Sequence, residues 1–161
     1  MTRSRVRELL GFLHDIDARL GVEKLGGKIT LFVFGGAAAV IAYGSRRGTA
    51  DIDAYLEDDA LRKKLLGWAG EDSELAKKHG IHLHGANISL MLIEDPDWKD
   101  RCLEIFKGRL KNMRVRALGK EDLILSKLSR YNDRDREDIQ FLAENHKIDL
   151  KKLIACYRMA R

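Results

Sequence analysis

The sequence predicts an α+β protein built on a small mixed sheet that is flanked by helices, with a helical C-terminal region. Two strand-like segments with a short helix between them lie in the first half of the 161 residues, and three helical stretches follow one another after Lys120. Hydrophobic residues make up 45% of the chain, which contains one proline, as is typical of a folded domain. We expect one domain, 1–161, with a sheet-containing core at about 28–117 and C-terminal helices at about 120–160.

The first half of the chain contains four regular patterns. Apolar residues recur every three or four positions over 3–20 and stop at Gly21, which predicts an amphipathic helix. "KITLFVF" (28–34) is β-branched and aromatic and predicts a buried strand. "GAAAVIAY" (36–43) predicts a short helix that begins at two glycines. "ADIDAYL" (50–56) alternates apolar with acidic residues, so it predicts a strand with one polar face.

The second half is expected to add further strands and then helices. A helical pair is predicted over 58–69 and 71–79, followed by a strand over "ANISLMLI" (86–93). "CLEIFK" and "MRVRAL" are expected to pair as a hairpin that turns through "GRLKN". The remaining pattern is helical over 120–130, 134–145 and 149–160.

Composition and charge narrow the classes of function. Cys102 and Cys156 do not form a CxxC pair, so two reduced thiols in a cytoplasmic protein are expected. Acidic residues within the first helical stretch argue against a signal peptide, and no uncharged apolar run approaches the roughly 20 residues of a membrane span. The net charge of +5 fits a polyanionic partner but is spread along the chain.

Two features flank the predicted helix at 36–43. Gly35 and Gly36 follow a strand directly, and a glycine turn at a helix N-terminus lets an anion approach backbone N–H groups closely. Asp51 and Asp53 are one residue apart in a predicted strand, so both carboxylates project from one face. Like charges placed together repel, and a divalent cation such as Mg²⁺ is the usual reason for such a pair.

Each feature alone is weak evidence, because a glycine pair is often only a tight turn and an isolated DxD is often a solvated strand face. Together they indicate a triphosphate that rests on the glycine turn while Mg²⁺ joins it to the aspartates. Arg47 and Thr49 would add a cation and a hydroxyl beside the same phosphates. This arrangement is typical of metal-assisted nucleotidyl transfer.

"FGGAAAVIAYGSRRGTADIDAYL" resembles the signature of the DNA polymerase β-like nucleotidyltransferase superfamily. More specifically, GG…R-x-T-x-D-I-D is similar to the first motif of the abortive-infection and toxin–antitoxin type nucleotidyltransferases. "KEDLILSKLSR" (120–130) resembles their helical E-x-x-x-x-x-K-L motif, and "DRDREDI" (133–139) their R-D-x-x-D motif. The resemblance implies a nucleotidyltransferase fold and extends from residue 32 to about 139.

The resemblance also implies an activity and its residues. It suggests an Mg²⁺-dependent transfer of a nucleoside monophosphate from an NTP onto an RNA, such as tRNA, or onto a protein hydroxyl, in a toxin–antitoxin or phage-defence system. The nucleotide-binding residues would be Gly35, Gly36, Arg47, Thr49, Lys127 and Asp135. The metal ligands would be Asp51 and Asp53, which would act in catalysis together with Lys127.

A second hypothesis remains open. In it the chain is a degenerate, non-catalytic protein of the same fold that acts as an antitoxin or as a binding partner, with a cognate toxin or antitoxin protein as its partner. Ala37 stands where many family members have Ser or Thr. Many members also have a third carboxylate on a later strand, and the expected strand at 86–93 contains no acid. Neither Glu94 nor Glu104 can be placed at the site from the sequence. A two-metal mechanism is therefore not predicted.

Overall fold

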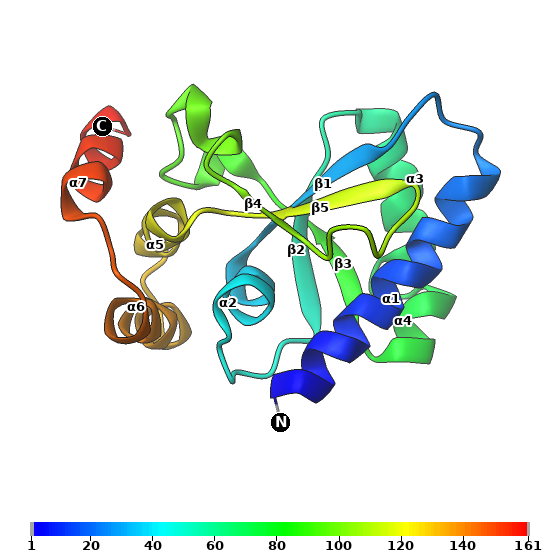
Figure 1. The fold of residues 1–161 in the computed structure, drawn as a ribbon, viewed down its shortest axis with the longest axis horizontal. Helices are drawn as coiled ribbons and strands as arrows, with labels where there is room; N and C mark the ends of the chain where they lie inside the picture. Colours follow the sequence, from blue (N-terminus) through cyan, green and yellow to red (C-terminus); the bar gives the residue numbers. More distant parts are fainter. Residues whose placement is uncertain (1, 161) are drawn as a thin grey trace.

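A computed structural model describes residues 2–160 and shows helices arranged around a five-stranded sheet (Figure 1). The strands are β1 (Ile29–Phe34), β2 (Asp51–Tyr55), β3 (His82–Gly85), β4 (Leu103–Ile105) and β5 (Met113–Ala117). The α-helices are α1 (Thr2–Val22), α2 (Gly35–Tyr43), α3 (Asp59–Ala69), α4 (Glu74–His79), α5 (Lys120–Leu128), α6 (Asp133–Asn145) and α7 (Leu150–Met159). Two short 3-10 helices are η1 (Ile88–Leu90) and η2 (Pro96–Lys99). The predicted α+β class is confirmed.

The sheet is mixed, with the strand order β3-β2-β1-β5-β4. The central strand β1 runs antiparallel to β2 and parallel to β5, while β3 is parallel to β2 and β4 is antiparallel to β5. The predicted hairpin is therefore present as β4 and β5, with Ile105 opposite Val115. Since β1 and β2 are neighbours, the end of β1 and its glycine turn lie beside the aspartates of β2.

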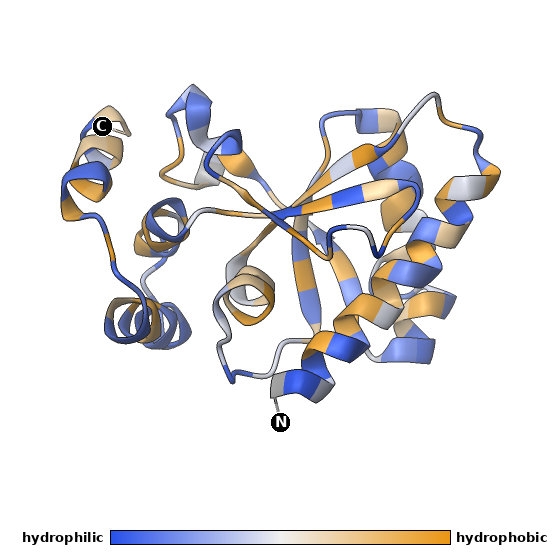
Figure 2. Ribbon diagram, in the orientation of Figure 1, coloured by the Kyte–Doolittle hydropathy of each residue, from blue (hydrophilic) through white to orange (hydrophobic). Residues whose placement is uncertain are grey.

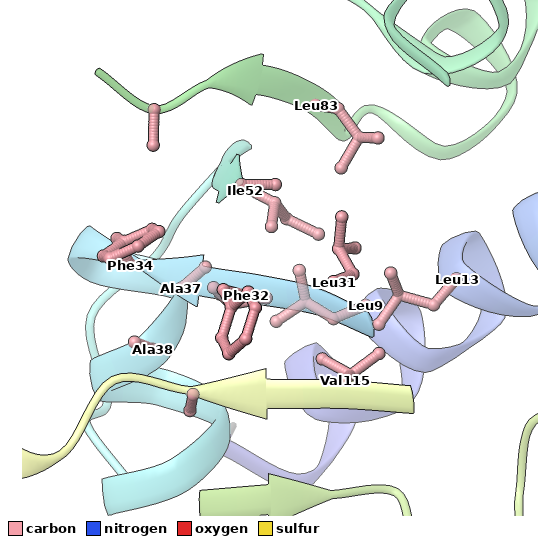
Figure 3. Packing of buried hydrophobic residues seen from close by; sticks show 14 of the residues in the cluster. Leu9, Leu13, Leu31, Phe32, Phe34, Ala37, Ala38, Ile52, Leu83 and Val115 are labelled. Carbon is pink, nitrogen blue, oxygen red and sulfur yellow. The ribbon is translucent and has the colours of Figure 1, made fainter. Parts of the chain in front are cut away.

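One face of the sheet packs on the N-terminal helix. Figure 3 shows Leu9 and Leu13 of α1 directed towards Leu31 and Val115 of the sheet. Hydrophobic and hydrophilic residues alternate along α1 (Figure 2), and most of its leucines and isoleucines, with Phe12, enter the core. Burying a leucine of this kind contributes roughly 1.5–3 kcal/mol, so the α1 contacts are a major part of the core.

The other face of the sheet is partly covered by the segment that joins β3 to β4. Trp98 in η2 contacts Phe32 and Phe34 of β1, with ring centroids 5.0 and 5.5 Å apart. Paired residues of adjacent strands share a face, and Phe34 pairs with Asp53 and Phe32 with Tyr55. This face therefore carries the acidic residues of β2 beside an aromatic cluster.

One predicted strand is wrong. Residues 86–93 form a loop that includes η1, while the strand beside β2 is β3, immediately before them. The Asn87 side chain accepts a hydrogen bond from the Ser89 N–H at 3.1 Å, which favours a turn over an extended chain. The apolar residues that suggested a strand, among them Ile88 and Met91, instead pack against the core from this loop.

The three C-terminal helices lie beyond α2, at the opposite end of the molecule from α1, α3 and α4 (Figure 1). The Tyr43 hydroxyl donates a hydrogen bond to the Leu118 carbonyl at 2.7 Å, and His146 contacts the Tyr43 carbonyl at 2.8 Å. These bonds fix α5 and α6 against α2. Within the described residues, no helix has the length and apolar character needed to cross a membrane.

Candidate nucleotide and metal site

The glycine pair forms the junction between β1 and α2, as the sequence predicts. Gly35 has a φ of 62°, a left-handed conformation that other residues adopt at a cost. Phe34 occupies the N-cap position of α2, and its apolar side chain makes no capping hydrogen bond. The first N–H groups of the helix therefore have no side-chain acceptor at the cap, which leaves a turn suited to an anionic group.

Asp51 and Asp53 lie on the polar face of β2, next to this turn. Asp51 is exposed and Asp53 is half-buried, whereas Ile52 between them is fully buried in the core. A Cβ atom built on Gly35 would lie 2.4 Å from Asp53 Oδ2, so the backbone of the turn and the carboxylate are in direct contact. The structure thus brings the two ends of the "GG…DID" motif together.

The chemistry of these donors fits Mg²⁺. Hard carboxylate oxygens are its preferred protein ligands, and the ion commonly uses one or two of them together with substrate phosphates. Among residues 2–160, no side chain pairs with the Asp51 carboxylate. A cation bound between the two neighbouring carboxylates would relieve their mutual repulsion. No group of three or more potential metal ligands occurs in the described part of the chain.

The strand next to β2 places a histidine opposite Asp53. His84 of β3 pairs with Asp53 in the register, and its Nδ1 lies 3.1 Å from Asp53 Oδ1. Glu104 lies on β4, which β1 and β5 separate from β2, so it is about 14 Å of strand spacing away. The position beside Asp53 on the neighbouring strand is therefore held by an imidazole and not by a carboxylate.

Arg47 and Thr49 come from the loop between α2 and β2. The Thr49 hydroxyl donates a hydrogen bond to the Asp51 carbonyl at 2.9 Å, which fixes the entry to β2. Arg47 Nη1 lies 2.6 Å from Asp138 Oδ2 of α6. The loop is therefore anchored to β2 by Thr49 and to α6 by Arg47.

Lys127 is 2% exposed and lies at the centre of a buried ion network. Its Nζ is 2.6 Å from Asp138 Oδ2 and 3.7 Å from Asp135 Oδ1. Asp138 thus binds both Lys127 and Arg47, from two segments about 80 residues apart in the chain. A buried lysine needs such counter-charges, because an unpaired charge in the interior is costly.

Asp135 caps the N-terminus of α6 together with Asn132. It forms a reciprocal capping box with Asn132, in which the Asn132 side chain accepts the Asp135 N–H at 2.9 Å. Arg130 Nη2 lies 3.1 Å from Asp135 Oδ1. The side chain of Asp135 is 2% exposed, and its carboxylate contacts both Arg130 and Lys127.

These residues surround a pocket of about 130 Å³, which we call the basic pocket. Its lining consists of Gly36, Arg47, Thr49, Asp51, Asp53, Lys127, Arg130, Asn132, Arg134 and Asp135. Seven of the eight residues predicted from the sequence are in this lining, and the eighth, Gly35, lines an adjoining cavity together with Asp53 and Lys127. The pocket combines three carboxylates, a helix N-terminus and four cationic side chains.

The sequence alone did not single out Arg130, Arg134 and Asp138 as site residues. Arg134 and Asp138 lie in the R-D-x-x-D motif, so their spacing was a usable signal, but an isolated helix would use them as a surface pair. The Arg47–Asp138 contact spans the fold and cannot be read from local spacing. Ala37 is 1% exposed in the core and is not among the residues that line the basic pocket.

Comparison with known proteins agrees with this geometry. Searches of the curated proteins and of the solved structures gave no match. A family model described as "Nucleotidyltransferase of unknown function (DUF6036)" matches residues 8–160, which include every element that builds the basic pocket. The chain therefore belongs to this family of nucleotidyltransferases.

Proposed function

We propose that the chain is an Mg²⁺-dependent nucleotidyltransferase that moves a nucleoside monophosphate from an NTP onto the hydroxyl of an RNA, such as tRNA, or of a protein. The observation that carries the proposal is the basic pocket, where the β1–α2 glycine turn, the carboxylates of β2 and the cations of α5 and α6 converge. Triphosphates need all three features, namely backbone donors, a metal and positive side chains.

Each group has a role that its position supports. The α2 N-terminus at Gly36 would bind phosphate oxygens, and Arg134 and Arg130, which are exposed at the pocket, would pair with the leaving phosphates. Asp51 and Asp53 would hold Mg²⁺, which when bound neutralises charge that develops on the phosphates. Lys127 would add a fixed positive charge beside them.

The proposed reaction breaks a phosphoanhydride bond of the NTP and forms a phosphodiester bond to the acceptor. The acceptor oxygen forms a bond to the α-phosphorus, the bond between that phosphorus and its bridging oxygen to the β-phosphate breaks, and pyrophosphate leaves. The hydroxyl proton of the acceptor is released to solvent. The protein contributes position and charge, because phosphoryl-type transfers need little covalent chemistry from the enzyme.

A second candidate is a non-catalytic binding partner, such as an antitoxin. The observation in its favour is His84, which lies where a further carboxylate could have approached Asp53. The resemblance to abortive-infection and toxin–antitoxin proteins supports a cytoplasmic defence role under either candidate. The two differ in whether Mg²⁺ and an NTP bind and react.

Titration calorimetry of the full chain with each NTP, with and without Mg²⁺, tests the proposal. We expect Mg²⁺-dependent binding that Asp51→Asn and Asp53→Asn abolish, together with the transfer of radiolabelled nucleotide. Glu104→Gln is the matched control, because it removes an exposed strand carboxylate at the far edge of the sheet. Transfer that survives both aspartate substitutions would overturn the assignment. Metal-dependent binding without transfer to any acceptor, or no binding at millimolar NTP, would favour the partner role.

A further inference from the structure

Three cavities follow one another along the polar face of β2. The basic pocket contains Asp51 and Asp53. A middle cavity of about 220 Å³ shares Asp53, Lys127 and Arg130 with it. A third cavity of about 680 Å³ shares Gly85, Ala86 and Asn87 with the middle one and reaches Tyr55.

The spacing along β2 links these cavities to one another. Asp51, Asp53 and Tyr55 project from one face of the strand at intervals of two residues, or about 6.6 Å. Tyr55 is thus the next side chain on that face after the proposed metal ligands. A molecule that occupies the third cavity can extend to Asp53 without crossing a strand.

We call the third cavity the aromatic pocket, after Tyr55 and Trp98, which lie at its wall with ring centroids 6.2 Å apart. It is also lined by two cations, Arg62 and Lys99, and by the polar residues Asn87 and Ser89. In the described chain, no acidic side chain is part of this lining. Trp98 is buried, so half-buried Tyr55 supplies the ring surface that a ligand can reach. The pocket adds positive charge and hydrogen-bonding groups to it, without a carboxylate that would repel phosphate.

The ion pairs of the two cations face outwards. Arg62 pairs with Asp59 at 2.7 Å, and Lys99 pairs with Glu57; the side chains of these acids are 75% and 64% exposed. Exposed ion pairs contribute little to stability, so both cations can exchange their partners for a ligand phosphate at small cost. Lys99 also lies 5.7 Å from the centroid of the Trp98 ring, which keeps its charge at the aromatic wall.

The geometry of the proposed reaction indicates which ligand the aromatic pocket would bind. In an in-line displacement the attacking oxygen and the leaving group lie on opposite sides of the phosphorus. If pyrophosphate leaves from the basic pocket, the acceptor hydroxyl must approach Asp53 from the other side, where the middle cavity opens. Aromatic rings and cations together are the usual means of binding single-stranded nucleic acid, through base stacking and phosphate contacts.

We propose that the aromatic pocket binds the 3′-terminal nucleotides of a single-stranded nucleic acid, whose terminal hydroxyl reaches Asp53 through the middle cavity. This inference rests on the proposed function, which it deepens by naming the acceptor and its binding site. RNA and DNA share the required bases and phosphates, and the experiment distinguishes them.

The test measures the fluorescence anisotropy of short single-stranded RNA and DNA oligonucleotides, labelled at the 5′ end, with the full chain. We expect Arg62→Glu to weaken binding about tenfold or more, whereas Lys63→Glu changes it by about twofold or less. Lys63 is the matched control, because it is the neighbouring exposed residue of α3 and its reversal changes the net charge equally, but it does not line the pocket. Tyr55→Leu should weaken binding about tenfold, and Tyr55→Phe should preserve it.

A second measurement locates the 3′ end independently of affinity. An oligonucleotide with 4-thiouridine at its 3′ terminus should crosslink to peptides that contain Tyr55 or Trp98 on irradiation. The same variants are titrated with Mg²⁺ and NTP, and that affinity should not change, because these side chains lie outside the basic pocket.

The outcomes separate the two proposals. If Mg²⁺ and NTP bind but no oligonucleotide does at about 100 μM, the aromatic pocket is not a nucleic-acid site, and a protein acceptor is indicated. Equal effects of Arg62→Glu and Lys63→Glu, or crosslinks elsewhere on the chain, also overturn it. If oligonucleotides bind at Tyr55 while NTP does not bind at all, the proposed function fails and the nucleic-acid site stands. Tighter binding of RNA than of DNA identifies RNA as the acceptor.

Discussion

Gly35 and Asp53 approach so closely that a methyl group on Gly35 would lie 2.4 Å from Asp53 Oδ2. Gly35 also has a φ of 62°, so both its conformation and its neighbour require glycine. Gly36 differs from it, because the nearest atoms to its added methyl would be Arg47 Cζ and Thr49 Oγ1, each at an ordinary 3.7 Å. The two adjacent glycines therefore serve different purposes, the first for the fold and the second for access to the basic pocket.

Substitution of these glycines should separate stability from binding. Gly35→Ala should lower the free energy of unfolding by at least about 1–2 kcal/mol, from the left-handed conformation alone. Gly36→Ala should leave stability unchanged or raise it by up to about 1 kcal/mol, since alanine favours a helix. Both substitutions should weaken Mg²⁺-dependent NTP binding. The methyl of Gly35→Ala would displace the Asp53 carboxylate, and the methyl of Gly36→Ala would enter the basic pocket. Urea denaturation and calorimetry measure the two effects, and a Gly36→Ala variant that binds NTP normally would contradict this assignment.

Asp138→Asn should be strongly destabilising. Its carboxylate is 2% exposed and pairs with both Lys127 and Arg47, so its loss leaves two cations short of a partner. Breaking a buried pair in this way costs about 3–5 kcal/mol. Asp133→Asn, on the same helix but with a side chain that is 92% exposed, should cost less than about 1 kcal/mol. Equal unfolding free energies for the two variants would show that the buried network contributes little.

Stability should decline in acid partly through Asp95. The pKa of Asp95 is held below its ordinary 3.8, first because its carboxylate accepts the Asp97 backbone N–H and also because it pairs with Arg101. The unfolded chain therefore binds this proton at a higher pH than the folded chain does, and the stabilisation is lost as pH falls from about 4 through the folded pKa. The stability difference between wild type and Asp95→Asn, measured in urea from pH 6 to pH 3, should shrink over that window. A difference that stays constant with pH would contradict this origin.

Both cysteines should be unreactive in the folded protein. Burial raises the pKa of the Cys102 thiol to about 11 and also raises the pKa of the Cys156 thiol. At pH 8 only about one Cys102 in a thousand is then a thiolate, and the side chain is also shielded from reagents. A thiol-reactive dye should label the chain slowly until denaturant is added, and Cys156→Ser assigns the remaining signal to Cys102. Rapid labelling of the native variant would show that the region around Cys102 opens readily.

The elements around the glycine pair and the aspartates were predictable because their patterns are local. β1 and α2 form where an apolar run meets two glycines, and β2 forms where acidic and apolar residues alternate. The sequence indicates β3 only as an extended stretch with His82 and His84 on one face, because a strand of four residues with two histidines has a weak pattern. The apolar loop at 86–93 has a stronger strand pattern, although its residues are buried by packing against the core and not by strand pairing.

The site was predictable as a set of residues, but its connections were not. Motif order pointed to Asp51, Asp53 and Lys127, and the structure places them around one pocket. The contact between Arg47 and Asp138 joins distant segments, and the His84–Asp53 pairing depends on the register of a parallel strand. Neither of these tertiary contacts produces a periodic pattern in the sequence from which it could be predicted.

The ion pair between Arg47 and Asp138 joins an early segment of the chain to a late one, so the basic pocket is completed late in synthesis. The sheet has all of its strands once β5 has left the ribosome, whereas Lys127 and Asp138 are translated later. A nascent chain can therefore fold its central layer while the basic pocket still lacks one wall. A ligand that needs the complete basic pocket can therefore bind only after α6 has been translated.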